Sequence, residues 1–231
     1  MGHSLLAFAL GALLARRAGV RPSLVLPIGL LAGGFALLPD VDAAYTVYAV
    51  LQTGPENLFP TPRYVWTADA WRVHRALTHS LVVGVVASLG VGALGFALGR
   101  RRDSPRGWTK SPAVVAGGVA GLAGLGAILA AGVTTDGAAG LATAGLYVVG
   151  ALLLAAVAVE RGVPARWLGG AAAVGLLTHP FGDLFMGRPP AFLFPRSSTP
   201  PIGKLAVAAD PTVNLVALFG LELALAWAAV W

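Results

Sequence analysis

The sequence predicts an all-α fold, a polytopic transmembrane helical bundle of about six to seven membrane segments that forms a single domain over residues 1–231. Composition is the first observation: 57% of the residues are hydrophobic and 11% are charged, against about 25% charged in an average soluble domain. The mean hydropathy is +0.77. Apolar stretches also recur along the whole chain, at residues 4–15, 23–38, 77–98, 112–133, 138–159, 166–186 and 212–231.

The first two apolar segments are short for a membrane crossing. At about 1.5 Å per residue, residues 4–15 cover only about 18 Å as a helix, whereas the hydrocarbon core is about 30 Å thick. We therefore expect His3, just before this segment, to be partly sunk below the membrane surface. Residues 23–38 end at Pro39, which disfavours helix at the preceding residue.

The longer segments carry signs of close helix packing. Small residues recur at four-residue spacing, as Gly84, Ser88 and Gly92 in one segment and Gly117 and Gly121 in the next. This spacing is typical of membrane helices whose backbones approach closely.

Charge and cysteine content exclude several classes of partner and site. The net charge of +6 comes largely from short connections, where basic residues set membrane orientation and contact anionic headgroups. We therefore expect no nucleic-acid partner. Because the chain has no cysteine, disulfides and thiolate metal sites are excluded, and any metal must be held by His, Asp or Glu.

Basic residues cluster in the connections after the first, third and fifth segments, which alternating spans place on one side of the membrane. The positive-inside rule assigns that side to the cytoplasm. The extracytoplasmic face then holds every histidine and most aspartates, and an inverted topology would keep the same cluster together. This polar set comprises His3, Asp40, Asp42, His74, His79, Asp136, His179, Asp183 and Asp210.

His179 and Asp183 form an HxxxD pair near the end of segment 166–186. Residues four apart share one helix face, with Cβ atoms about 5–6 Å apart, which suits joint binding of a divalent metal. The alternative is a histidine bonded within the bundle and an aspartate that faces water. Pro180 removes a backbone donor between them, so we expect a kink.

Asp40 and Asp42 end an apolar segment, where unpaired carboxylates at membrane depth are costly. On a continuing helix they would point about 200° apart, so both join one site only if the chain turns after Pro39. Otherwise they are solvated loop residues.

The stretch His74-Arg75-Ala76-Leu77-Thr78-His79-Ser80 carries two of the four histidines. On a straight helix His74 and His79 are offset by about 140°, so either the chain bends between them or they serve different ions. Arg75 is a candidate for binding a phosphate or for pairing with an aspartate. Thr78 and Ser80 are candidates for donors behind the ligands or for helix caps.

The polar face thus offers seven nitrogen and oxygen ligands, His3, Asp40, Asp42, His74, His79, His179 and Asp183. Imidazole together with carboxylate suits zinc, and also manganese or iron. The set is large enough for one or two ions.

The motifs follow one another over nearly the whole chain: an N-terminal histidine, Leu-Pro-Asp-x-Asp (38–42), His-Arg-x-x-Thr-His-Ser (74–80) and His-x-x-x-Asp (179–183). This pattern resembles the YdjM-like membrane-bound metal-dependent hydrolases, also called the domain-of-unknown-function-457 family. That family is similar to zinc-dependent phospholipase C and P1-type nucleases, all-helical enzymes with multinuclear zinc sites. The chain departs from those enzymes in having a single HxxxD-type pair, so one or two ions are expected instead of a trinuclear centre.

The resemblance implies a phospholipase-C-like helical core that hydrolyses a phosphoester of a lipid or lipid-linked substrate with a metal-activated water. The implied metal ligands are His3, Asp40, His74, His79, His179 and Asp183. Asp42 is the candidate base or bridging ligand, and Arg75 the candidate group that neutralises phosphate charge. Substrate contacts are expected from Arg75, Thr78, Ser80, Arg188 and Arg196. The loop that carries Arg188 and Arg196 has the alternative role of a connector that touches headgroups.

Two other functional classes use the same residues. A metal-ion or proton transporter would scatter ionisable groups through the depth of several helices, whereas segments 112–133 and 138–159 contain no charged residue. A non-catalytic scaffold stabilised by a metal would need the same ligands, because ligands alone do not show an open coordination position.

Overall fold

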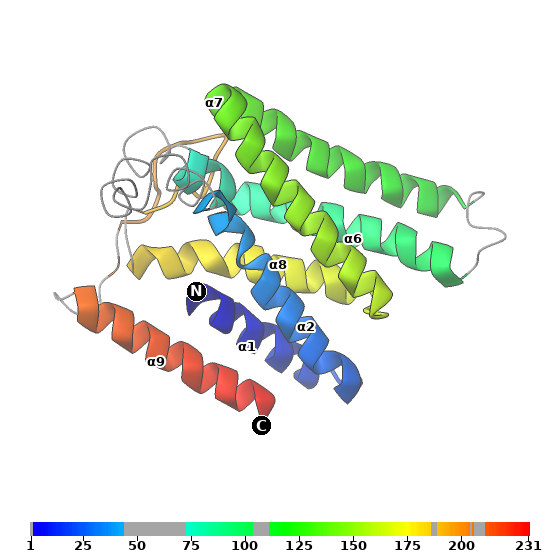
Figure 1. The fold of residues 1–231 in the computed structure, drawn as a ribbon, viewed down its shortest axis with the longest axis horizontal. Helices are drawn as coiled ribbons and strands as arrows, with labels where there is room; N and C mark the ends of the chain where they lie inside the picture. The colour runs from blue at the N-terminus through cyan, green and yellow to red at the C-terminus, as the bar shows by residue number, and fades with distance from the viewer. Residues whose placement is uncertain (1, 44–72, 104–110, 186–188, 204, 206–210) are drawn as a thin grey trace, which may run out of the picture.

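The computed structural model describes residues 2–43, 73–103, 111–185, 189–203, 205 and 211–231. All regular structure in these residues is helical, as predicted (Figure 1). In chain order the elements are α1 (Gly2–Arg17), α2 (Pro22–Phe35), the 3-10 helix η1 (Leu38–Ala43), the π-helix η3 (Val73–Thr78), α6 (Leu81–Asp103), α7 (Pro112–Glu160), α8 (Ala165–Gly182), the 3-10 helix η5 (Asp183–Phe185) and α9 (Pro211–Val230).

Four helical segments of the described chain are long and apolar enough to cross a membrane, namely Leu81–Gly99, Pro112–Thr135, Gly140–Glu160 and Thr212–Val230. Large apolar side chains such as Leu122 and Leu153, each 63% exposed, point outward from them, as expected of helices that face lipid. α1 and α2 have 16 and 14 residues, too few to cover about 30 Å. The described helices therefore support four crossings, and the expected count of six to seven is not reached.

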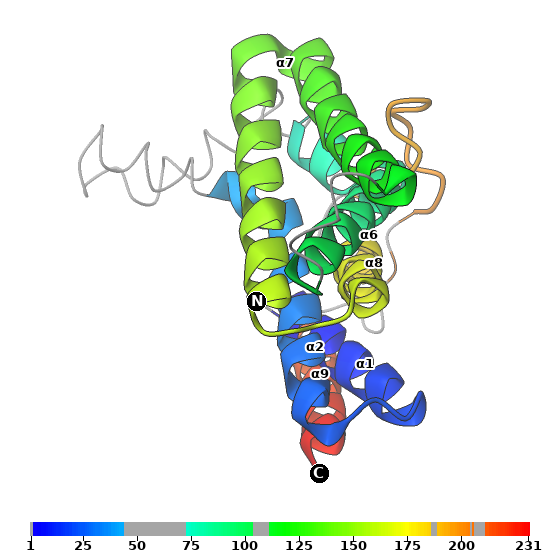
Figure 2. The same ribbon diagram turned by 90° about the vertical axis from the view of Figure 1, so that its right-hand side faces the viewer.

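α7 is a helical hairpin whose two arms lie side by side (Figures 1 and 2). Gly137 at the bend has a φ of +50°, a conformation that glycine adopts without steric cost. A methyl group built on Gly132 would lie 2.6 Å from Ala144 Cβ, although twelve residues of straight helix span about 18 Å. The arms correspond to the predicted segments 112–133 and 138–159.

Small residues allow the central helices to approach closely. A methyl group on Gly92 of α6 would lie 3.3 Å from Gly169 Cα of α8, and one on Gly117 of α7 would lie 3.2 Å from the Ala93 carbonyl of α6. These contacts confirm that the small residues at four-residue spacing serve helix packing.

α7 and α9 lie on opposite sides of the bundle, with α6, α8, α2 and α1 between them (Figures 1 and 2). The core between these helices is apolar and includes Phe35, Leu77 and Leu176. α1 begins beside His3 and ends at Arg17. α8 runs in the opposite sense, because it begins just after the connection that contains Arg161 and has His179 near its end. Among the described residues, His3 and His179 therefore lie at one end of the bundle, and Arg17 and Arg161 lie at the other.

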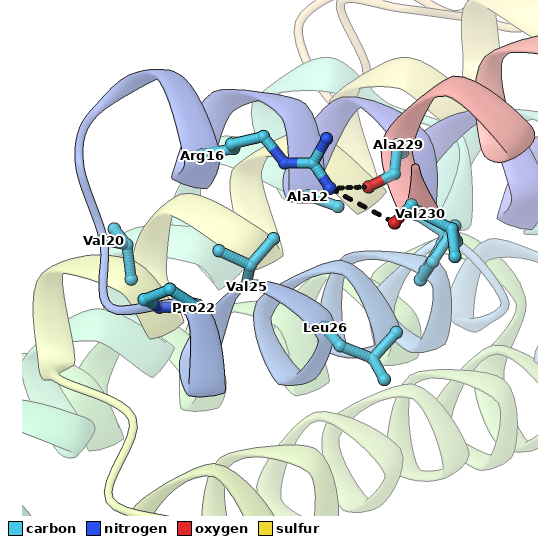
Figure 3. A pocket seen from close by; sticks show the side chains of 9 residues that line it. Ala12, Arg16, Val20, Pro22, Val25, Leu26, Ala229 and Val230 are labelled. Carbon is cyan, nitrogen blue, oxygen red and sulfur yellow. Dashed lines mark hydrogen bonds between the residues drawn. The ribbon is translucent and has the colours of Figure 1, made fainter.

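A cavity of about 250 Å³ lies at the basic end between α1, α2 and α9 (Figure 3). Apolar side chains such as Phe8 and Val25 line it. Arg16 Nη2 donates to the carbonyls of Ala229 (2.8 Å) and Val230 (3.4 Å), which fastens α1 to the last turn of α9. The cavity is thus remote from the histidine cluster.

Candidate metal centre

Segments far apart in the sequence converge at the histidine end of the bundle. His3 lies in the first turn of α1, Asp40 in η1 and His79 in the turn after η3. His179 lies in the last turn of α8, and Asp183 begins η5. The three histidines and Asp183 are buried, whereas the Asp40 side chain is 40% exposed. The cluster is thus closed on the bundle side and open beside Asp40.

Asp183 lies at the middle of this cluster. Its Oδ1 is 3.1 Å from His3 Nε2, and its Oδ2 is 2.8 Å from His79 Nε2 and 3.8 Å from His179 Nε2. Arg75 Nη1 donates to the same Oδ2. Of the two roles proposed for Arg75, pairing with an aspartate is therefore the one seen.

His79 and His179 face each other with their Nε2 atoms 3.2 Å apart. Asp40 Oδ1 is 3.6 Å from His79 Nε2 and 3.5 Å from His179 Nε2. The ligand atoms form two groups, His3 with His179 and Asp183, and Asp40 with His79 and His179, each within 4.8 Å. His179 belongs to both groups.

The partners behind the imidazole rings orient two of them. His179 Nδ1 lies 2.7 Å from the Ala36 carbonyl, which can only accept, so Nδ1 carries the hydrogen and Nε2 presents its lone pair to the cluster. His79 Nδ1 lies 3.0 Å from Thr78 Oγ1, and its Nε2 also points inward. A ring fixed from behind in this manner is typical of metal-ligating histidine.

The distances fit a divalent cation. Two ligand atoms that are each about 2.0–2.1 Å from a tetrahedral zinc lie about 3.3–3.4 Å apart. Among Asp40 Oδ1, His79 Nε2, His179 Nε2 and Asp183 Oδ2, the distances given above run from 2.8 to 3.8 Å. The inward lone pair of His179, the His79 Nε2 atom and two carboxylates lie at the spacing of ligands around one cation, so the residues present fit a metal.

Asp183 is held in its ionised state. It lies in η5, beyond the end of α8 and outside the membrane-spanning segments. Burial raises the pKa of this carboxyl group, but hydrogen bonds with His3 and His79 and the positive charges nearby outweigh burial and hold its pKa well below its usual range. A carboxylate is the form that a metal ligand requires.

The HRxxTHS stretch contains a break, which is the first of the two alternatives that the phase of His74 and His79 left open. The π-helix ends at Thr78 and α6 begins at Leu81, so the chain leaves the helix between His74 and His79. Ser80 fulfils the predicted role of a cap, because its Oγ accepts from the backbone N–H groups of Val82 (3.1 Å) and Val83 (3.3 Å). Thr78 lies behind His79.

Other predicted residues contribute differently or lie elsewhere. Arg196 is described, and it is exposed in a turn near the start of α6. The side chains of Asp42 and His74 and the whole of Arg188 lie outside the described residues. Residues 43–72, whose mixture of prolines and aromatic residues predicts an interfacial loop, also lie outside them, apart from Ala43.

Sequence reasoning missed Glu222, a residue of α9 that is only 1% exposed. Its Oε1 lies 3.8 Å from His3 Nδ1. Glu222 is the only charged residue in segment 212–231, and a lone carboxylate in a membrane segment is itself a signal of function.

Replacing Gly182 by alanine should weaken metal binding by about tenfold or more while the fold persists. A methyl group at Gly182 would overlap the His3 ring and push that ligand away, although alanine favours helix over glycine. Gly170→Ala in the same helix is the matched control, because a methyl group there meets nothing within 4 Å. Zinc titration and thermal unfolding of both variants test this, and equal zinc affinity in the two would contradict the placement of His3.

Comparison with known proteins identifies a family. The family model of the YdjM inner membrane proteins matches the whole chain, residues 1–231. No curated protein and no solved structure matches the chain. The full-length match, the apolar helices and the ordered motifs together show that the chain belongs to the YdjM inner membrane protein family.

Proposed function

We propose that this protein is a membrane-bound metal-dependent hydrolase that cleaves a phosphoester of a lipid or lipid-linked substrate. The observation that carries the proposal is the half-open ligand cluster. His3, His79, His179 and Asp183 are buried, whereas Asp40 is 40% exposed at its side chain. Closed ligation is typical of structural metal sites, whereas catalytic sites leave one position open to water and substrate.

The proposed cofactor is zinc, with manganese or iron as alternatives. When bound, such an ion polarises a P–O bond and lowers the pKa of a bound water. Both ligand groups use the inward nitrogen of His179, and one ring nitrogen binds one ion. The described residues therefore support one ion, and a second would require Asp42 or His74.

The remaining roles belong to residues around the cluster. Arg75 is proposed to balance Asp183 and to stabilise charge on the phosphate, since its side chain is 14% exposed. Asp42 remains the proposed base, and Arg188 and Arg196 the proposed headgroup contacts. Thr78 and Ser80 already bond the neighbouring histidine and backbone groups, so we assign them to support instead of substrate contact.

The purified protein in mixed micelles tests the proposal. Chromogenic phosphodiesters and phospholipids of defined headgroup are offered with zinc, with manganese and with a chelator. We expect phosphoester hydrolysis that is lost with the chelator and in Asp40→Asn. The activity should be kept in Arg17→Gln, at the far end of α1. Bound metal without turnover of any phosphoester would instead support the non-catalytic scaffold.

The membrane location follows from the family and the apolar helices. We propose that the metal centre faces the extracytoplasmic side. Since the chain has no cysteine, any labelling of a single introduced cysteine comes from that position alone. Ser198→Cys, exposed near the cluster, should react with an impermeant maleimide in intact cells, whereas Ala18→Cys, exposed at the basic end, should react only after permeabilisation. The reverse result would invert the topology.

Glu222 gives transport its one specific support, because it adds an ionisable group on a membrane-spanning helix. Proteoliposomes loaded with a zinc-sensitive dye distinguish the two functions. Zinc flux that is lost in Glu222→Gln would favour a transporter, whereas an absence of flux alongside turnover would favour the hydrolase.

A further inference from the structure

We propose that Glu222 is a positioning residue of the metal centre, which accepts the Nδ1–H of His3 and so presents His3 Nε2 to the metal. The inference rests on the proposed metal site and adds to it a residue from α9. With Glu222 the centre would draw on helices from both ends of the chain.

The contact between the two side chains is buried and incomplete. Glu222 Oε1 lies 3.8 Å from His3 Nδ1, with side-chain exposures of 1% and 7%. Within the described part of the chain, His3 Nδ1 and both Glu222 carboxylate oxygens are buried without a hydrogen-bond partner. Closing the gap to about 2.8 Å would satisfy the donor and one acceptor together.

The opposite side of the His3 ring faces the cluster. His3 Nε2 lies 3.1 Å from Asp183 Oδ1, and the His3 and His179 rings meet edge to face with centroids 4.7 Å apart. A metal ion on Nε2 leaves Nδ1 as the only ring donor. Glu222 is the described carboxylate at that nitrogen, as the Ala36 carbonyl is at His179 Nδ1.

Helix packing holds Glu222 at this position. α9 packs against α1 through small residues, with Ala9, Ala12 and Ala229 forming a buried apolar cluster. Arg16 fixes the end of α9 to α1 by its bonds to the Ala229 and Val230 carbonyls. The α1–α9 interface therefore sets the distance between His3 and Glu222.

A carboxylate without a partner at membrane depth destabilises the helix that carries it. Packing alone would be served better by leucine at this position. Removing a carboxylate that orients a ligating histidine weakens metal affinity by about 10–100-fold in other sites. A role in orienting His3 therefore predicts that Glu222→Leu weakens zinc binding without lowering the metal-free Tm. A purely structural role predicts a lower metal-free Tm with unchanged zinc affinity.

The test compares wild type, Glu222→Leu, Glu222→Gln and the control Glu160→Gln, an exposed carboxylate at the far end of α7. Zinc affinity is measured by competition with a chelator, and thermal unfolding is measured without metal. The imidazole N–H groups are followed by NMR of protein labelled with ¹⁵N-histidine, in which His3→Gln assigns the His3 signal among four histidines.

We expect Glu222→Leu to bind zinc about 10–100-fold more weakly, to keep or raise the metal-free Tm, and to lose the downfield His3 Nδ1–H signal. Glu222→Gln should recover most of the affinity, because its amide oxygen accepts the same bond, and Glu160→Gln should match wild type.

An unchanged His3 Nδ1–H signal in Glu222→Leu overturns the pairing whatever the zinc affinity. A lower metal-free Tm with unchanged zinc affinity also overturns it and leaves a packing role. A wild type that binds no zinc contradicts the proposed function instead. The ¹⁵N shifts of the His3 ring in metal-free wild type and Glu222→Leu then decide the pairing, because they differ only if Glu222 pairs with His3.

Discussion

Replacing His179 by alanine should reduce bound metal from about one ion per chain to almost none. His179 is the one residue shared by both ligand groups, so its loss leaves neither group with three ligands. The Ala36 carbonyl already orients its ring, at 2.7 Å from Nδ1. Elemental analysis of the detergent-purified protein after dialysis measures the effect.

The neighbouring Thr178→Ala is the matched control, because the Thr178 hydroxyl bonds only the Val174 carbonyl of its own helix in the described contacts. It should retain the metal content of wild type. His179→Ala should also lower the metal-free stability by about 1–3 kcal/mol, since the buried Ala36 carbonyl loses its donor. Wild-type zinc content in His179→Ala would remove the metal centre from this end of the bundle.

Arg75→Gln should destabilise the metal-free protein by about 3–5 kcal/mol, the usual cost of leaving one member of a buried ion pair alone. Arg75 pairs with Asp183, and their side chains are 14% and 8% exposed. Zinc should restore much of the loss, because a cation on the Asp183 carboxylate replaces the missing charge. Thermal unfolding with and without zinc measures both effects.

Arg196→Gln provides the comparison, since Arg196 is exposed and exposed charges contribute little to stability. Its Tm should stay close to wild type in both conditions. If zinc does not reduce the difference in Tm between Arg75→Gln and wild type, then Arg75 does not share the Asp183 carboxylate with a cation.

Local sequence rules predicted much of the centre. The four-residue spacing of His179 and Asp183 and the position of His3 just before a short first segment depend on helix geometry alone, and all three residues lie in the cluster. The phase conflict between His74 and His79 likewise predicted either a bend between them or separate ions, and the helix does end at Thr78. These predictions held because each needs only the residues of a single segment.

Other features depend on how distant segments pack. Arg75 had two chemically equal roles, and only the approach of η5 selects the bond to Asp183. Glu222 meets His3 because α9 docks on α1, a contact that no spacing rule contains. Of the expected six to seven membrane segments, four are described helices long enough to cross, and α1 and α2 have only 16 and 14 residues.

The short helices have a consequence for the surrounding bilayer. α1 and α2 would cover about 24 Å and 21 Å, on a side of the bundle where Leu26 and Leu30 are 53% and 61% exposed. Hydrophobic mismatch of this size is relieved by local thinning of the lipid. Headgroups next to α1 and α2 would then be drawn toward the level of Asp40, so the phosphate of the proposed lipid substrate would reach the proposed metal ligands while its acyl chains remain in the membrane.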